Sequence, residues 1–324
     1  MHKKQNHAVT SLEADNKITS MQVNARQIIR DSMPPTLYKF YPCNDNNFDA
    51  LEKQQIWLSH PQFFNDPFDA NHLININRLR DGLNAYKNSS HRLGKFWNTV
   101  LSHLQMRSTH SFNEHIQQAK KIVTKWVKIT CFSETYKNPL LWAHYAEGHK
   151  GYVVGFKKSD LCQHAILPVT HKYNDCPMPF FDLLPVVYDN SRHDCTENYL
   201  YFFREYLNRV KRKKAQEQVI TYKDALKFSE CFLFKSKSWE YENEWRLLRF
   251  SDDLADFESH GMLVTCKPSE IYLGCKMSSL HKRHIESIVH SLNQRRDYGK
   301  KIQVFELHQP TTNPSKGYSL IQRG

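Results

Sequence analysis

Hydrophobic and polar positions fall into short blocks along most of the chain, and these blocks predict a mixture of strands and helices. The aromatic block "TLYKFY" over 36–41 predicts a first strand, and "IWLS" over 56–59 predicts a second. Between them, "NDNNFDALEKQQ" predicts a helix capped by Asn46 or Asn47, because a short amide side chain can accept a hydrogen bond from the first turn. The fold therefore opens as strand, helix, strand.

The same reasoning predicts most later elements. Further strands are predicted in "VKITCFSET", "GYVVGF", "LPVVYD", "WRLLRF", "EIYLG" and, as the last strand, "KIQVFELH". Helices are predicted within 78–128, around Leu140 to Ala146, and in "NYLYFFREYLNRVKRKKAQEQ" and "SSLHKRHIESIVHSLNQRR". The segment "FFNDPFDAN" is rich in turn-forming residues set between aromatic anchors, which predicts a structured turn.

These elements predict an α+β protein with one main mixed sheet. We expect a single domain over 34–308, with helical insertions near 78–128 and 197–230. Residues 1–33 are polar and lack periodicity, so they predict either a flexible arm or a short docking helix. Residues 309–324 are expected to form a C-terminal tail.

Composition narrows the class of protein and of its partners. Hydrophobic residues make up 40% of the 324 residues and aromatic residues 13%, which predicts a folded globular chain. The net charge of +12 favours an anionic partner, such as a nucleic acid, a phosphorylated cofactor or an acidic protein. No segment approaches the roughly 20 apolar residues of a membrane span, and the N-terminus lacks the apolar core of a signal peptide. We therefore expect a cytoplasmic protein with no membrane partner.

The eight cysteines form no C-x-x-C pair, which argues against a disulfide scaffold. His193 and Cys195 in "RHDCTEN" form a close histidine and cysteine pair, and this pair lacks the second half that a zinc motif needs. The sequence therefore predicts buried free thiols and no metal centre.

An acidic and aromatic cluster stands out in "KSKSWEYENEWRLLRF", over 235–250. Glu240, Glu242 and Glu244 alternate with aromatic residues immediately before a stretch that reads as a buried strand. Carboxylates are usually left in water, so two of them at the entrance of a buried strand indicate a site. We predict that Glu242 and Glu244 lie on one face there, because alternate strand residues share a face.

Five motifs in order carry a resemblance to a known family. They are "LYKFY", "FNDPFD", "CFSET", "WAHYAEGHKG" and "WEYENEWR". In this order, over about Leu37 to about Gly274, they resemble a large and mostly bacterial family known as domain of unknown function 2971.

The chain also resembles the ADP-ribosyltransferase fold. That fold begins with a strand that carries an NAD-contacting polar residue, presents a Ser or Tyr site later, and ends with a carboxylate, often in E-x-E, that opens a late strand. "LYKFY", "CFSET" or "WAHYA", and "ENE" are similar to these three features. Two departures stand out: Lys39 replaces the usual Arg or His, and "FNDPFD" lacks a counterpart in the better-known toxins.

The resemblance implies an NAD-cleaving enzyme that transfers ADP-ribose to a macromolecule, either a protein or a nucleic acid. Bacterial proteins of this kind serve as toxins, effectors or phage-defence components. The positive charge that develops on the ribose as its N-glycosidic bond breaks calls for a fixed carboxylate, a role we assign to Glu244. Glu242 would orient or deprotonate the acceptor.

Several other residues are candidates for binding NAD. Tyr145 is suited to stack on nicotinamide, and Lys39 and Arg246 are suited to the pyrophosphate. The remaining candidates are Ser133, Asn65 and Asp66. Each has a structural alternative: Arg246 as one half of an ion pair with Glu242 or Asp66, Ser133 as a cap, and the "FNDPFD" turn as a rigid connection.

Two further hypotheses use the same residues. Asp66, Asp69, Glu242 and Glu244 would hold magnesium in a nuclease-like site if they converged. Alternatively, the chain is a basic module that binds a nucleic acid or a protein without catalysis, and its acidic cluster is structural.

Overall fold

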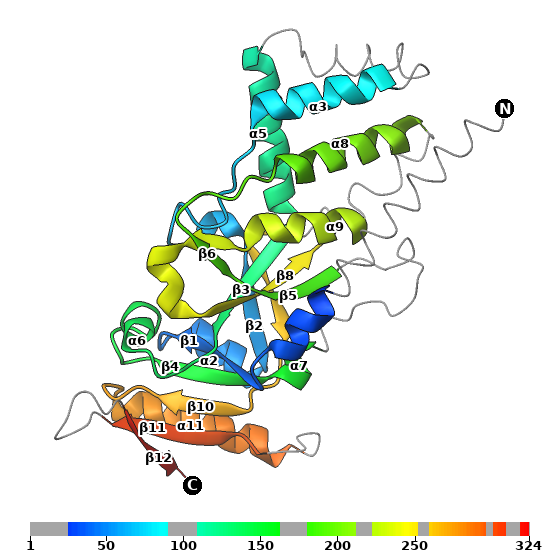
Figure 1. The fold of residues 1–324 in the computed structure, drawn as a ribbon. Coiled ribbons are helices and arrows are strands. Elements are labelled where there is room, and N and C mark those ends of the chain that lie inside the picture. Colours follow the sequence, from blue (N-terminus) through cyan, green and yellow to red (C-terminus); the bar gives the residue numbers. More distant parts are fainter. Residues whose placement is uncertain are drawn as a thin grey trace.

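The structure of the protein is a computed structural model, and it describes residues 25–89, 109–162, 180–211, 222–251, 259–295, 301–308 and 318–323. Helices and strands are mixed throughout, as the sequence predicts, around one large sheet (Figure 1). None of the helices in these ranges has the length and apolar character needed to cross a membrane.

The main sheet has ten strands within the described ranges, and it is mixed because β10 and β11 run parallel while the other pairs are antiparallel. Its path is β12-β11-β10-β4-β1-β3-β2-β9, and β8 pairs with both β3 and β5. The strands are β1 (Thr36–Tyr41), β2 (Gln55–Ser59), β3 (Val127–Ser133), β4 (Tyr152–Lys157), β5 (Phe180–Pro185), β8 (Glu244–Phe250), β9 (Gly261–Thr265), β10 (Glu270–Leu273), β11 (Gln303–His308) and β12 (Ser319–Arg323). Two short parallel strands, β6 (Val187–Asp189) and β7 (Phe234–Ser236), form a separate pair.

Helices gather at two ends of this sheet (Figure 1). One group lies beside β3 and β8 and the other beside β10 and β11 (Figure 1). The first group contains α3 (Ile76–Ser89), α5 (Thr109–Lys125), α8 (Thr196–Lys211) and α9 (Tyr222–Ser229), and the second contains α11 (Ser279–Gln294). The shorter helices are α2 (Asp45–Glu52), α6 (Pro139–Tyr145), α7 (Lys158–Cys162) and the 3-10 turns η1 (Pro61–Phe63), η3 (Glu230–Phe232) and η4 (Lys237–Glu242).

Strand β8 separates the two main hydrophobic clusters. Trp245 and Leu247 pack into the cluster that contains β1, β4 and α11, whereas Leu248 and Phe250 pack into the cluster that contains α5, α8 and α9. Both faces of this strand are buried, so "WRLLRF" does not alternate between apolar and polar residues, and its two arginines, Arg246 and Arg249, are buried as well. The face of Leu248 and Phe250 is also the face of Glu244, because alternate residues share a side.

Residues 25–32 of the N-terminal segment form a helix that packs against β5. Arg26 donates from Nε to Asp182 Oδ2 at 2.8 Å, and Arg30 donates from Nη2 to Asp182 Oδ1 at 3.3 Å. Asp182 on β5 is fully buried, so two guanidinium groups compensate one buried carboxylate. Residues 1–24 lie outside the described ranges.

Three predicted boundaries were wrong. Helix α2 is capped by Asn44, whose side chain accepts from the Asn47 backbone N–H, and not by Asn46 or Asn47. The segment "LPVVYD" is divided between β5 and β6, because the Val186 N–H still bonds the Glu244 carbonyl of β8 whereas the Val187 N–H bonds the Leu233 carbonyl next to β7. Strand β11 is not the last strand, since β12 pairs with it from within the expected tail.

Candidate active site

A fork in the sheet opens beside β3. One edge of β3 pairs with β8 along its whole length, from Val127↔Phe250 to Ser133↔Glu244. The other edge is shared by two strands: β1 reaches it at Tyr38↔Ser133, and β2 reaches it at Ser59↔Ile129. The backbone between these two contacts has no strand beside it, and a cavity of about 320 Å³ occupies this region. A cavity of this size is at the lower end of the range for small-molecule sites.

Most of the predicted site residues line this one cavity. The structure brings together Lys39 of β1, Asn65 of the turn, Ser133 of β3, Tyr145 of α6, and Glu242 and Glu244 at the start of β8. These residues come from five separate segments, so their convergence depends on the fold and not on local spacing. Aromatic walls from Phe63, Phe64 and Trp57 give the cavity an apolar side.

Glu242 and Glu244 share one cation. Lys235 of β7 donates to Glu242 Oε2 at 2.6 Å and to Glu244 Oε2 at 2.9 Å. Strict strand alternation does not produce this arrangement, because Glu242 ends η4 and the intervening Asn243 has a left-handed backbone with φ of 44°. The turn at Asn243 therefore sets the relative position of the two carboxylates.

Arg246 lies beneath the same carboxylates and is fully buried. Its Nε donates to Glu244 Oε1 at 2.7 Å, and its Nη2 lies 2.7 Å from both oxygens of Asp69. Its Nη1 donates to the Phe232 carbonyl at 2.6 Å. All of these contacts are internal and Arg246 does not border the cavity, so we withdraw the predicted pyrophosphate contact. The sequence offers Glu242 or Asp66 as ion-pair partners of Arg246. In the structure its partners are Asp69 and Glu244.

The charges of this cluster do not cancel. Asp69, Glu242 and Glu244 supply three carboxylates, and Lys235 and Arg246 supply two cations, which leaves one net negative charge when all five are ionised. All five side chains are buried, so this excess charge acts across a medium that screens it less than water does.

The environments of the two glutamates push their pKa values apart. Burial favours the neutral form of Glu244, but Arg246 and Lys235 outweigh it and hold the pKa of Glu244 well below its ordinary value. Burial raises the pKa of Glu242, with only partial compensation by Lys235 and a further rise from Glu244. Carboxylates with divergent pKa values are suited to different catalytic roles.

Tyr145 and Asn65 lie on the solvent side of Glu242. The Tyr145 hydroxyl donates to Glu242 Oε1 at 2.8 Å, and Asn65 Nδ2 donates to the Tyr145 hydroxyl at 3.5 Å. Burial and the adjacent Glu242 raise the pKa of Tyr145, so the phenol stays protonated and keeps donating. Helix α6 positions this ring because Asn138 caps its N-terminus and Trp142 is buried in the core below it.

Lys39 and Ser133 border the cavity from the two strands that meet at the fork. Lys39 Nζ donates to the uncovered Cys131 carbonyl at 3.4 Å, and burial lowers its pKa. The Ser133 hydroxyl donates to the Glu242 backbone carbonyl at 2.7 Å and accepts from the Thr135 N–H at 3.2 Å. The predicted capping role of Ser133 is therefore present together with its place on the cavity wall.

Asp66 has a different environment from its neighbours. Its Oδ1 accepts from the Phe68 N–H at 2.8 Å, and it borders a second hollow of about 540 Å³. This second hollow shares Asn65 and Lys235 with the cavity at the fork, so the two spaces adjoin. Asp66 thus holds the turn in place, while Asp69 of the same turn belongs to the charged cluster.

The magnesium hypothesis finds little support in this geometry. Asp69, Glu242 and Glu244 meet at Lys235, but every one of them is already paired with a lysine or an arginine. A metal ion would have to displace these cations, and Asp66 does not join the cluster. Within the described ranges, these carboxylates do not form a group with the spacing of metal ligands.

Sequence reasoning missed two residues of the site. In the sequence Lys235 is followed by serine and lysine residues typical of a solvent-exposed segment, and no local pattern marks it as a buried cation. Tyr188 of β6 accepts a hydrogen bond from the Glu244 N–H of β8 at 2.8 Å. Both depend on tertiary contacts that no local pattern encodes.

One family resembles this chain by sequence comparison. The family described as "Protein of unknown function (DUF2971)" matches residues 141–247, which confirms the resemblance over a range that contains two of the five motifs, "WAHYAEGHKG" and "WEYENEWR". The matched range contains Tyr145, Glu242 and Glu244, while Lys39 and Ser133 precede it. Neither the curated proteins nor the solved structures gave a match.

Proposed function

We propose that this chain, whose residues 141–247 match the DUF2971 family, cleaves NAD and transfers ADP-ribose to a macromolecule. One observation carries the proposal: Glu242 at the end of η4 and Glu244 at the start of β8 both border the cavity at the fork and belong to a cluster with an excess negative charge. In this proposal the sheet is the core of an ADP-ribosyltransferase-like fold, and the helices α3, α5, α8 and α9 are insertions.

The proposed chemistry begins at the ribose carbon that bears nicotinamide. The carbon–nitrogen bond breaks, its electron pair leaves with the nicotinamide nitrogen, and positive charge develops on the ribose. Glu244 stays ionised across the physiological range because its pKa is held low. Its carboxylate, with the net negative charge of the cluster, stabilises that positive charge as it forms.

Transfer requires a second group that accepts a proton. An oxygen or nitrogen nucleophile of the acceptor attacks the same ribose carbon, and its proton passes to Glu242. Burial raises the pKa of Glu242, so its carboxylate is more basic than an exposed glutamate. Each Glu242 oxygen accepts one hydrogen bond, from Tyr145 or from Lys235, and retains a lone pair for the incoming proton.

The spaces around the cluster support a dinucleotide. The cavity of about 320 Å³ at the fork suits the nicotinamide and its ribose, with Tyr145 and the aromatic wall beside the ring. The adjoining hollow of about 540 Å³ offers room for the adenosine half of the molecule. Lys39 borders the cavity at the fork and would contact the pyrophosphate, because Arg246 is buried and does not border the cavity.

The experiment measures nicotinamide release and ADP-ribose transfer for three glutamate variants. Glu244→Gln removes the charge but keeps the side-chain size, so both reactions should fall by about 100-fold or more. Glu242→Gln should suppress transfer and spare NAD hydrolysis. Glu240→Gln is the matched control, because Glu240 is exposed and does not border the cavity.

Circular dichroism of each variant shows whether it remains folded. Equal and small effects for all three glutamates would contradict the proposal, because the cluster would then be structural. Binding of nucleic acid or protein by a preparation that releases no nicotinamide would favour the non-enzymatic alternative.

A further inference from the structure

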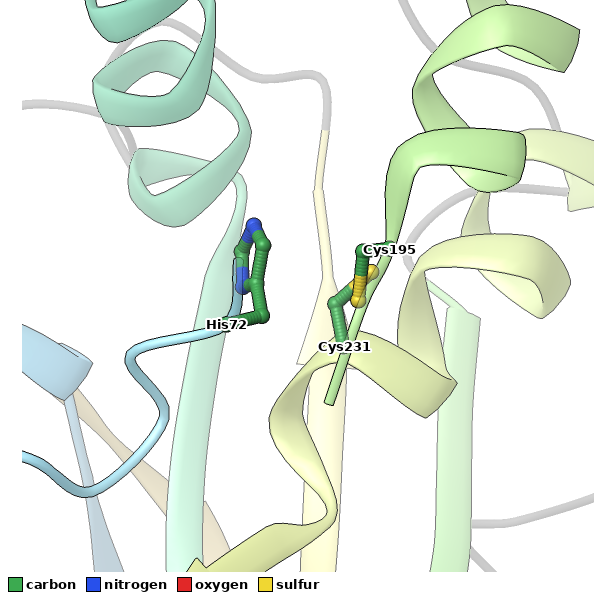
Figure 2. A group of neighbouring side chains, drawn as sticks. All are labelled: His72, Cys195 and Cys231. Carbon is green, nitrogen blue, oxygen red and sulfur yellow. The ribbon is translucent and has the colours of Figure 1, made fainter. Parts of the chain in front are cut away.

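A second group of reactive side chains lies beside the charged cluster. His72, Cys195 and Cys231 come together from three segments that are far apart in the sequence (Figure 2). One potential ligand atom from each residue lies within 4.8 Å of the others, and all three residues are buried. The two sulfur atoms lie next to each other, and His72 lies to one side of them on a separate segment (Figure 2). This is the one group of three potential metal ligands within the described ranges.

We propose that these residues bind a zinc ion through the two cysteine sulfurs and one imidazole nitrogen. Two thiolates and an imidazole are ligands that Zn²⁺ prefers, whereas Mg²⁺ and Ca²⁺ prefer oxygen. Small adjustments of the three side chains would be needed to reach zinc bonding distances of about 2.0 to 2.3 Å.

The surroundings of His72 leave one ring nitrogen available. Its Nε2 lies 3.0 Å from the Tyr199 hydroxyl. Its buried Nδ1 makes no well-formed hydrogen bond with a described residue, although the Cys231 backbone lies close enough to the ring to raise the His72 pKa against the larger lowering by burial. A histidine that donates its Nε2–H to a hydroxyl presents a lone pair on Nδ1, which is the tautomer of a metal ligand held by an outer partner. A bound ion would satisfy a buried nitrogen that otherwise costs free energy.

The two cysteines are suited to become thiolates only when a cation is present. A zinc ion deprotonates the thiols that bind it, and two thiolates neutralise its charge. Lys120 adds positive charge nearby, because its Nζ donates to the His72 carbonyl at 2.6 Å and to Asn71 Oδ1 at 2.8 Å.

The hollow of about 540 Å³ gives a metal ion access to the three residues and leaves room for a fourth ligand. His72 and Cys231 both border it, so an ion has a route from solvent to the cluster. Zinc in proteins is usually four-coordinate, and three protein ligands leave one position that water from the hollow can fill.

The site would connect segments that build the charged cluster. His72 follows Asp69 in the same loop, and Cys231 precedes Phe232, whose carbonyl accepts from Arg246. The loop and the start of α8 already touch, since the Cys195 N–H donates to the Leu73 carbonyl at 2.9 Å. A zinc ion bound by all three residues would link this contact to η3, and it would so stabilise the segments that carry Asp69 and Phe232 beside the candidate active site.

The first test is the metal content of the full-length protein, purified after growth with added zinc and measured by inductively coupled plasma mass spectrometry. The wild-type chain should carry about one zinc ion. Cys195→Ser, Cys231→Ser and His72→Gln should lower zinc affinity by more than about 100-fold in a chelator competition, since loss of an outer partner alone costs up to that factor. Cys266→Ser is the matched control, because Cys266 is a buried free cysteine of the other main core cluster.

The second test needs no variant and therefore does not depend on how a variant folds. Metal-free wild-type protein is titrated with Co²⁺, and absorption from thiolate-to-cobalt charge transfer is recorded. The band should saturate at one equivalent and disappear when Zn²⁺ is added. Absence of the band, zinc content unchanged in both cysteine variants, or binding of Cu(I) with rejection of zinc would each overturn the proposal.

Discussion

Lys235 Nζ donates to Glu244 Oε2 at 2.9 Å, and the same ammonium donates to Glu242 Oε2 at 2.6 Å. This one cation holds together two carboxylates that would otherwise repel each other in a buried environment. Because its partners are charged and buried, Lys235 contributes both to the stability of the fold and to the geometry of the candidate site.

Replacing Lys235 with methionine should therefore destabilise the protein. The change keeps the length of the side chain but leaves three buried carboxylates with one remaining cation. Removal of one partner from a buried ion pair costs about 3 to 5 kcal/mol, which urea denaturation would measure. Lys237→Met is the control, since Lys237 is exposed and should change the free energy of unfolding by less than about 0.5 kcal/mol. Equal stability of the two variants would show that the carboxylates do not depend on Lys235.

The turn "FNDPFD" offers a comparison between two aspartates. Asp69→Asn removes a carboxylate that lies 2.7 Å from Arg246 Nη2, and it also removes the excess negative charge of the cluster. It should lower both the melting temperature and the rate of nicotinamide release. Asp66→Asn should lower neither, because an asparagine oxygen can still accept from the Phe68 N–H. A larger loss of nicotinamide release in Asp66→Asn would place Asp66 in the site instead.

Two substitutions of Tyr145 should separate the contribution of ring stacking from that of hydrogen bonding. Tyr145→Phe keeps the ring but removes the bond to Glu242, so NAD affinity should change little while transfer falls by about 10-fold or more. Tyr145→Ala should weaken NAD affinity as well, because the aromatic surface is lost. Isothermal titration and a transfer assay would measure the two effects. Leu140→Ala, an exposed position on the same helix, serves as the control. Unchanged transfer in Tyr145→Phe would show that the Tyr145 hydroxyl has no role in the reaction.

The two glutamate environments predict different pH profiles for the two reactions. Glu242 must be ionised to accept a proton. Because burial raises its pKa, transfer should already decline at a pH above about 4.3, the ordinary pKa of a glutamate, as the solution is made more acidic. The pKa of Glu244 is held low, so it stays ionised and NAD hydrolysis should persist at lower pH. Parallel assays across about pH 4 to pH 8 would compare the acid limbs. Coincident limbs would mean that one group controls both reactions.

Much of the fold follows from local sequence. The aromatic and β-branched blocks of β1, β3, β4 and β8 are long enough and apolar enough to identify themselves as strands. The two glutamates were identified because charge beside a buried strand is unusual. The cap of α2 was misplaced because four closely spaced Asn and Asp residues, Asn44 to Asn47, offer similar local chemistry.

The parts that could not be predicted depend on which segments become neighbours. The fork exists because β3 gives one edge to two strands, and pairing partners are not encoded in a single strand. Lys235 reaches the glutamates only after β7 pairs with β6. Cys195 was noticed beside His193, yet the fold places it with His72 and Cys231 and stacks His193 on Phe234.

The most direct test of the central claim is a crystal structure of Glu244→Gln with NAD, since this variant should bind the dinucleotide without cleaving it. The account predicts electron density for nicotinamide and its ribose in the fork between β1 and β2, with the ribose beside residue 244 and the ring near Tyr145. Density for NAD elsewhere on the protein, or an empty fork at a concentration where calorimetry shows binding, would contradict it.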